Sequence, residues 1–236
     1  MGLRINIQKN LPYFTLDVSF VCPDKKMLVL IGPSGSGKTT ILRMIAGLDK
    51  PDAGTIVYNG ETWLDVKSNI LVPPQKRCLG YVFQDYTLFP HLNVYGNAAF
   101  SAFDKKEAED LLKLFGIWHL RNRKPYEISG GERQRCALCQ ALARRPRVLL
   151  LDEPFSALDP ITRRMLCDEL KALKGRLTLP LVYVTHDVSE AFLLGDEIMP
   201  VVEGKVQESW LQHASAMTPV MNHGWSTNDW EAVCKM

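Results

Sequence analysis

The most constraining feature of the sequence is a glycine-rich loop, Gly32–Thr39 (GPSGSGKT), between an apolar run and a helix-like stretch. Met27–Ile31 is continuously apolar, as in a strand buried on both faces. Thr39–Ala46 carries apolar residues at helical spacing and stops at Gly47. A strand, a glycine-rich loop and a helix in this order predict an α/β fold that holds phosphate groups at the start of the helix.

The residue types of this loop suit a chain of charged phosphates. Glycines let backbone N–H groups turn toward phosphate oxygens, and the positive end of the following helix faces the same point. Lys38 supplies a point charge, and the Thr39 hydroxyl is a ligand for Mg²⁺. The expected nucleotide contacts in the loop are Gly32, Pro33, Ser34, Gly35, Ser36, Gly37, Lys38, Thr39 and Thr40.

A second feature is an apolar strand that ends in two acids, Val148–Glu153 (VLLLDE). Ligands of open α/β sheets bind at the carboxyl ends of the strands, where these acids would emerge. We expect Asp152 to hold Mg²⁺ and Glu153 to orient and deprotonate an attacking water. The alternative is a strand that ends in acids merely because it reaches solvent.

Composition excludes several classes of protein. The 236 residues carry a net charge of +2, too small to indicate nucleic acid as a partner. The longest apolar runs have the length of strands, far below the ~20 residues of a membrane-spanning helix, and the polar N-terminus is not a signal peptide. We interpret Cys136-x-x-Cys139 as buried thiols within a helix rather than as a metal or redox site.

The pattern along the chain predicts three regions. Strands with period-two alternation dominate the start, including Thr55–Tyr58, which ends in the hairpin signal Asn59-Gly60. A helical segment follows at about 86–145, with a capping box expected at Asp104 and Glu107. Other expected elements are the strands Leu79–Phe83, Val148–Leu151, Leu181–Thr185 and Glu197–Val202 and the helices Ile161–Leu173 and Val188–Leu194.

This order predicts an α/β fold with an N-terminal antiparallel β subdomain and an inserted helical subdomain. We expect residues 1–208 to form one domain. Residues 209–236 show no clear period and hold Trp210, Trp225 and Trp230, so we interpret them as a short tail of unknown role.

A third motif makes the comparison with known families specific. Ile128–Arg135 (ISGGERQR), upstream of the acidic strand, resembles the signature sequence of ATP-binding-cassette (ABC) proteins, although the usual form has Gln where this chain has Glu132. Gln84 in YVFQD resembles the Q-loop glutamine, Ser156–Asp159 the D-loop, and His186 in YVTHD the switch histidine. The resemblance covers residues 1–208 and implies a P-loop NTPase of the ABC-cassette fold that hydrolyses ATP.

The resemblance also implies an assembly. Two copies would join head to tail around two ATP molecules, each held between the phosphate loop of one copy and the signature of the other. Ser129 and Gly131 would contact the γ-phosphate bound by the partner, the Gly130 amide would face the same anion, and Asp159 would link the two sites. A helix start of this kind presents a hydroxyl, amides and a dipole to an anion.

Roles for single residues follow from the same resemblance. The implied catalytic residues are Glu153 as general base, His186 and Gln84, and the implied Mg²⁺ ligands are Thr39, Gln84 and Asp152. Adenine stacks on an aromatic residue before the phosphate loop in many members. Tyr13 is the candidate here, on the polar side of its strand, whereas we expect Phe14 to fill the core.

Gly80–Asn97 resembles the ATPase subunit of molybdate importers and, more broadly, of molybdate, tungstate and sulfate importers, and the insertion Trp63–Lys76, with Pro73-Pro74, fits that group. This implies a peripheral subunit on the cytoplasmic face of the membrane, with a separate permease and, indirectly, an extracytoplasmic substrate-binding protein. The candidate permease contacts are Tyr86, Leu88, Phe89, Pro90 and His91. Leu88 and Phe89 are equally suited to packing the helical subdomain.

Other readings stay open. The chain could instead be the ATPase of another ABC importer, for sulfate, iron or polyamines. The sequence distinguishes these importers from molybdate importers only by resemblance. A soluble ABC ATPase acting on nucleic acid or ribosomes is disfavoured by the near-neutral charge and the single cassette. Many molybdate ATPases carry a C-terminal oxyanion-binding domain, but 209–236 is too short for a core of its own, so we expect no such regulatory site in it.

Overall fold

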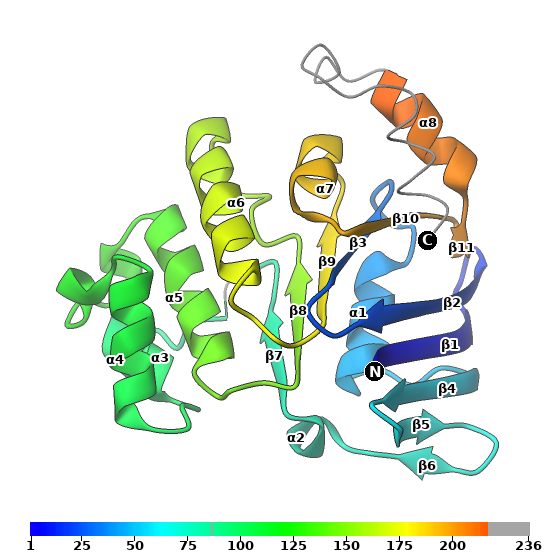
Figure 1. Ribbon diagram of the computed structural model, residues 1–236, viewed down its shortest axis with the longest axis horizontal. Helices are drawn as coiled ribbons and strands as arrows, with labels where there is room; N and C mark the ends of the chain where they lie inside the picture. The colour runs from blue at the N-terminus through cyan, green and yellow to red at the C-terminus, as the bar shows by residue number, and fades with distance from the viewer. Residues whose placement is uncertain (86, 217–236) are drawn as a thin grey trace.

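The computed structural model describes residues 1–85 and 87–216 of the chain. In that part the strands form a five-stranded and a six-stranded sheet. Figure 1 shows the antiparallel sheet at one end of the molecule, a helical lobe at the other and the parallel strands between them. Within these described residues, no helix combines the length and apolarity needed to cross a bilayer.

The first sheet is antiparallel, in the order β2-β1-β4-β5-β6. Its strands are β1 (Gly2–Asn10), β2 (Thr15–Pro23), β4 (Ala53–Tyr58), β5 (Glu61–Asp65) and β6 (Ile70–Leu71). Strands β4 and β5 are joined by Asn59 and Gly60, with φ of 47° and 86°. A two-residue hairpin turn of this type requires positive φ at both positions, so the predicted hairpin is confirmed.

The second sheet has the order β11-β10-β3-β9-β8-β7. Its parallel strands are β3 (Met27–Ile31), β7 (Leu79–Val82), β8 (Val148–Asp152), β9 (Leu181–Thr185) and β10 (Glu197–Val202), and β11 (Lys205–Val206) pairs antiparallel at the edge. Strand β8 runs one residue further than predicted, because Asp152 pairs with Val184, and β7 ends one residue earlier. The carboxyl ends of β3, β9 and β8 therefore lie side by side.

The parallel sheet separates two hydrophobic cores. Met27, Val29 and Ile31 of β3 face the first core, which contains α6 (Pro160–Lys174) and α7 (Val188–Leu194). Leu28 and Leu30 face the second, which contains α1 (Lys38–Ala46) and the antiparallel sheet. In Figure 1, α6 and α7 cover one face of the sheet and α1 the other. Strand β3 is fully buried for this reason, as its unbroken apolar run predicts.

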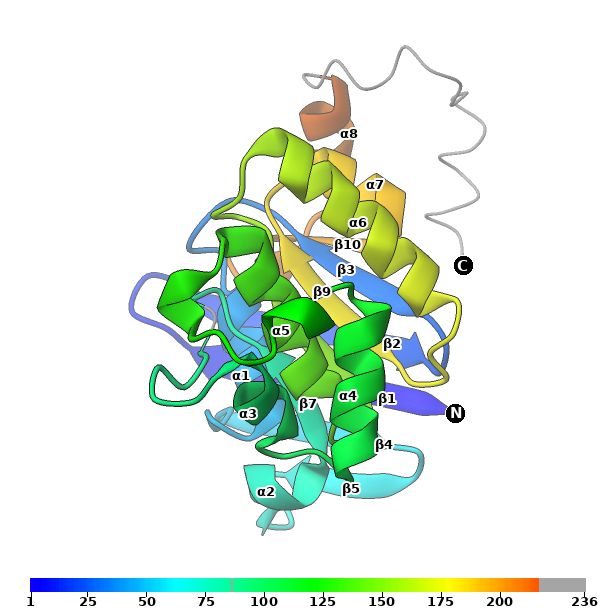
Figure 2. The same cartoon turned by 90° about the vertical axis from the view of Figure 1, so that its left-hand side faces the viewer.

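The segment between β7 and β8 is mostly helical and forms the lobe that faces the viewer in Figure 2. It contains α3 (Val94–Ala99), α4 (Lys105–Leu114), the 3₁₀ turns η1 (Trp118–Leu120) and η2 (Pro125–Glu127), and α5 (Gly130–Leu142). The capping box predicted for α4 is only half formed. Asp104 accepts the Glu107 N–H at 2.7 Å, but the Glu107 carboxylate accepts from Arg145 Nε at 2.8 Å.

The end of the described chain differs from the prediction. A helix, α8 (Glu208–Ala216), occupies part of the stretch for which the sequence showed no period. Leu211 is buried, and Trp210 packs partly against the first core. The sequence ESWLQHASA holds two large apolar residues, Trp210 and Leu211, and because they are adjacent they reveal no helical period. Trp225 and Trp230 lie outside the described residues.

The cysteines match their interpretation as structural thiols. Cys22, Cys78, Cys136, Cys139 and Cys167 are free, and Cys234 lies outside the described residues. Cys136 and Cys139 are fully buried, and burial raises the pKa of Cys136 to about 12. Such thiols stay protonated and are poor nucleophiles or metal ligands.

A buried arginine ties the phosphate-loop helix to the antiparallel sheet. Arg77, in α2 (Pro74–Arg77), is fully buried and donates to four main-chain carbonyls. Two belong to Met44 and Ile45 at the C-terminal end of α1, at 2.9 and 2.6 Å, and the others to Val72 and Trp63, at 2.9 and 3.4 Å. Burial lowers the pKa of Arg77 to about 10, so it stays charged at neutral pH. A cation there also suits the negative end of the helix dipole.

Arg77→Met should therefore destabilise the protein by about 3 kcal/mol, because it removes the donor to the Ile45 and Val72 carbonyls, whereas those of Met44 and Trp63 keep a main-chain N–H. For a chain of this size, that lowers the melting temperature by roughly 6–12 °C. Thermal unfolding followed by circular dichroism measures the shift, with Arg4→Met on the exposed face of β1 as the control. Equal melting temperatures for the two variants would contradict the assignment.

Candidate functional site

The glycine-rich loop leaves the carboxyl end of β3 and enters α1. A side chain at Gly32 is impossible, because its Cβ would lie 2.0 Å from the carbonyl oxygen of Val201 in β10. Gly37 caps the start of α1 with φ of 100°, in the region that favours glycine. The outer residues of the loop, Pro33, Ser34 and Gly35, are exposed. The loop is therefore a rigid turn with its outer edge open to a ligand.

The side chain of Lys38 points back into this turn. Its ammonium donates to the carbonyl oxygens of Gly32 and Pro33, both at 2.8 Å, and to Ser36 Oγ at 3.4 Å. Burial lowers the pKa of Lys38, and the nearby carboxylates of Glu153 and Asp152 oppose that shift. In the described part of the chain, the hydrogen bonds of the Lys38 ammonium thus go to neutral oxygens at the mouth of the loop, where a phosphate would be a stronger partner.

Thr39 and Asp152 meet across the gap between α1 and β8. The Thr39 hydroxyl donates to Asp152 Oδ1 at 2.9 Å, and the Tyr81 hydroxyl donates to Oδ2 at 3.0 Å. Burial raises the pKa of Asp152, and both hydroxyls work against the rise. A hydroxyl and a carboxylate are the hard oxygen ligands that Mg²⁺ prefers, so these residues fit the ion. Tyr81 was missed by sequence reasoning because it lies 71 positions before its partner.

The acid that follows β8, Glu153, pairs with the residue that follows β9, His186. Glu153 Oε2 lies 3.1 Å from His186 Nδ1, and the His186 side chain is half exposed while that of Glu153 is mostly buried. Glu153 has φ of 43°, and its N–H donates to the carbonyl of Val184 at 3.0 Å. The adjacent strand ends thus hold a carboxylate and an imidazole together at the edge of the phosphate loop.

The predicted signature residues begin α5. Ser129 is the N-cap and is exposed, and it forms a capping box with Glu132. Glu132 Oε2 accepts from the Ser129 N–H at 2.7 Å and from its hydroxyl at 2.9 Å. Gly130 and Gly131 pack against the start of α6: a Cβ on them would lie 3.2 Å from Leu158 and 2.9 Å from Thr162. The glycines therefore permit the close approach of two helix starts.

The remaining predicted site residues are more scattered. Asp159 is exposed and caps α6 by accepting the N–H groups of Ile161 and Thr162, at 3.1 and 3.0 Å. Gln84 is exposed just after β7. Tyr13 is 95% exposed in the turn between β1 and β2, whereas Phe14 packs against the second core beside Gly37. In the described residues, the hydrogen bonds of Asp159 stay within the start of α6, and Phe14 is the member of this group that contacts the phosphate loop.

The candidate permease contacts lie around α3. Phe89 packs on Phe100 with ring centroids 4.3 Å apart, Leu88 is partly buried against the first core, and His91 is exposed. Buried Asn97 holds this loop, because its Oδ1 accepts the Phe89 N–H at 2.7 Å and its amide donates to the Phe89 carbonyl at 3.1 Å. Pro90 is also exposed, and Tyr86 lies outside the described residues.

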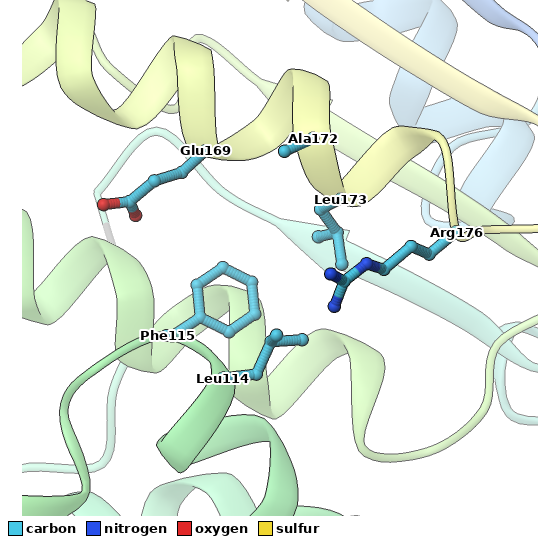
Figure 3. A pocket seen from close by; sticks show the side chains of 6 residues that line it. All are labelled: Leu114, Phe115, Glu169, Ala172, Leu173 and Arg176. Carbon is cyan, nitrogen blue, oxygen red and sulfur yellow. The ribbon is translucent and has the colours of Figure 1, made fainter.

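A cavity of about 160 Å³ lies between the C-terminal ends of α4 and α6, as Figure 3 shows. It is lined by Leu114, Phe115, Glu169, Ala172, Leu173 and Arg176 and contains none of the predicted site residues. Glu169 also accepts two hydrogen bonds from Arg135, at 2.7 and 3.0 Å, which join α5 to α6. We assign this region to helix packing and not to the nucleotide site.

Comparison with known proteins agrees with this geometry. The family model described as ABC transporter matches residues 15–156. The chain belongs to the ABC transporter family. The dimeric structure of a bacterial ABC transporter cassette superimposes with a TM-score of 0.72 and 30% identity, covering 87% of this chain and 97% of that one. The predicted ABC-cassette fold, with its antiparallel sheet, is thereby confirmed.

Relatives within the ABC family carry importer names. The molybdenum import ATP-binding protein ModC of Methylococcus capsulatus is 46% identical over 200 residues, covering 83% of this chain and 56% of that protein. The molybdate/tungstate import ATP-binding protein WtpC of Archaeoglobus fulgidus is 42% identical over 214 residues, 88% and 86% of the two chains. The sulfate/thiosulfate import ATP-binding protein CysA of Synechocystis is 44% identical over 215 residues, 86% and 58%. The chain thus spans less than three fifths of the ModC and CysA relatives.

Proposed function

We propose that this chain hydrolyses ATP as the nucleotide-binding subunit of an ABC importer, with two copies closing head to tail around two ATP molecules. The observation that carries the proposal is the meeting of three strand ends at the phosphate loop. Thr39 lies 2.9 Å from Asp152, and Glu153 lies 3.1 Å from His186. Residues 1–208 form the ATPase domain in this proposal, with the helical subdomain at about 86–145.

The chemistry divides among these residues. The backbone of the phosphate loop and Lys38 bind the phosphates. Thr39, Asp152 and Gln84 would hold Mg²⁺, which supplies positive charge against the phosphate oxygens when bound. The Glu153 carboxylate would take a proton from the attacking water, and His186, in hydrogen-bond reach of Glu153, would hold the γ-phosphate. Tyr13 is the proposed adenine contact.

The head-to-tail dimer is supported by the exposed helix starts. Ser129, the glycines beside it and Asp159 lie at the adjoining N-termini of α5 and α6, where an anion is favoured. The similar bacterial cassette is described as dimeric. We infer that these groups complete the site of a second copy.

Molybdate or tungstate is the proposed transported oxyanion, on the strength of the relatives' names. The chain would act at the cytoplasmic face of the membrane, against a permease fed by an extracytoplasmic substrate-binding protein. The loop that includes Leu88 and Phe89, braced by Asn97, is the proposed permease contact. Sulfate is the second candidate, because a sulfate/thiosulfate relative matches at 44% identity.

Reconstitution tests the proposal. The chain would be co-expressed with a candidate molybdate permease and assembled in liposomes with the corresponding substrate-binding protein. We expect ATP hydrolysis that increases when the binding protein is loaded with molybdate or tungstate. If only sulfate increases ATP hydrolysis, sulfate replaces molybdate and tungstate as the proposed substrate. Failure to form a complex with the permease would overturn the importer assignment.

Ser129→Ala tests the dimer. The variant should lower ATP turnover by about tenfold or more in the assembled transporter, because it removes a hydroxyl from the partner's site, while ATP affinity of the separate subunit stays the same. Asp104→Ala is the matched control, since it removes the N-cap of α4 and has a similar cost of about 1 kcal/mol in stability. Equal turnover in the two variants would argue against a signature that acts in trans.

A further inference from the structure

Arg163, on the first turn of α6, contacts two loops that both carry candidate catalytic residues. Its Nη2 donates to the main-chain carbonyls of Leu158 at 3.1 Å and Ser156 at 3.4 Å. Its Nη1 contacts Asp187 Oδ2 at 3.4 Å. The loop after β8 and the loop after β9 are thus bridged by one guanidinium.

The first loop transmits this contact to Glu153. The Ser156 N–H and hydroxyl both donate to the main-chain carbonyl of Glu153, at 3.2 and 3.0 Å. Arg163 accordingly holds the residue whose hydrogen bonds fix the Glu153 backbone. Since Glu153 has a positive φ of 43°, its conformation depends on such surrounding contacts.

The loop after β9 connects the Arg163 contact to His186. Asp187, the next residue, caps α7 by accepting the N–H groups of Ser189 and Glu190, at 2.7 and 3.2 Å. Its own N–H donates to Thr185 Oγ1 at 3.0 Å. His186 therefore lies between two residues that are both held in place, and Arg163 grips one of them.

A buried acid, Glu190, also lies beside the Arg163 guanidinium. The Glu190 carboxylate, 6% exposed, accepts from the hydroxyls of Tyr183 and Thr185, at 2.7 and 2.6 Å. Arg163 Nε lies 3.8 Å from Glu190 Oε1. Asp187 and Glu190 are the acids that face Arg163, so its charge balances both. Only a planar, multiply donating cation can make all these contacts, which lysine cannot reproduce.

We propose that Arg163 is a positioning residue, which keeps Glu153 and His186 in register by joining the D-loop to the switch loop. The effect on turnover rests on the proposed ATPase function. The effect on the two loops does not, and it can be measured without nucleotide.

Hydrogen exchange on the full chain is the first test. Arg163→Met should speed amide exchange in both 153–158 and 185–190, and Arg163→Lys should do so less. The control is Arg164→Met, on the neighbouring exposed arginine, whose recorded ion pair is with Asp168 on the same helix. Faster exchange in both loops supports the proposal. Unchanged exchange in either loop, or global unfolding in the Lys variant, overturns it.

Steady-state kinetics is the second test. Arg163→Met should lower kcat about tenfold or more, as expected for a misplaced catalytic group, with ATP affinity within twofold of the unmodified chain. Added to Glu153→Gln, it should lower turnover by less than it does alone, because one of the two groups that it positions is absent. Independent losses that multiply in the double variant overturn the positioning role. If the unmodified chain hydrolyses no ATP, the proposed function fails, and hydrogen exchange alone decides about Arg163.

Discussion

Glu153→Gln should reduce ATP turnover by about 10²–10⁴-fold, the range for loss of a general base, while ATP binding persists. The substitution keeps the size of the side chain and removes its capacity to take a proton. The backbone contacts of Glu153, with Val184 and Ser156, do not involve the carboxylate and should survive. Phosphate release measures turnover, and a fluorescent nucleotide measures binding.

The variant should also accumulate as an ATP-bound dimer, because closure no longer leads to hydrolysis. Size exclusion with ATP and Mg²⁺ would detect that species. Glu109→Gln, on the exposed surface of α4, is the control for the loss of one carboxylate. Turnover at the unmodified rate in Glu153→Gln would remove Glu153 as the base and direct attention to His186, its neighbour at 3.1 Å.

Lys38→Ala should weaken ATP binding itself, by roughly 10–100-fold. A charged hydrogen bond to phosphate contributes about 1.5–3 kcal/mol, and each 1.4 kcal/mol is a factor of ten in affinity. Lys38 also donates to the carbonyls of Gly32 and Pro33. The variant therefore loses both a phosphate partner and a donor that holds the loop.

Calorimetry with ATP in the presence of Mg²⁺ gives the affinity, and melting curves without nucleotide give the second effect. Lys67→Ala, at an exposed position near β5, controls for the net charge. An affinity equal to that of the control would mean that the backbone amides alone bind the phosphates.

The candidate site was largely predictable because its residues stand in short local motifs. Glycine spacing, an apolar run and the acids that end it locate Lys38, Thr39, Asp152 and Glu153 without tertiary information. Register then explains why they meet, since the parallel strands place Ile31 beside Thr185 and Asp152 beside Val184. The predicted bounds of β9, α7 and β10 also match the structure, because each of these elements has a local sequence pattern of its own.

The residues that brace the site were not predictable in this way. Tyr81 reaches Asp152 from another strand, Arg77 reaches α1 from 32 or more positions away, and Asn97 folds back on its own loop. Tyr81 and Asn97 lie in the stretch Gly80–Asn97 that carries the family resemblance, but nothing in that stretch indicates these contacts. A tyrosine, an arginine or an asparagine gains such a role only from what the fold brings near it. Glu132 was noted only as a departure from the family pattern, yet it grips the hydroxyl of Ser129.

The side chains of β3 are divided between two cores, and this affects how the protein unfolds. Alternate side chains of this one strand belong to opposite interiors, and β8 and β9 are shared in the same manner. Neither the antiparallel sheet nor the layer of α6 and α7 can melt without exposing a face of these strands to water. The two halves are therefore one cooperative unit, in which damage to either core lowers the unfolding temperature of both. Nucleotide bound at the edge of β3 stabilises that unit as a whole, so its protection against heat or proteolysis extends well beyond the residues that it touches.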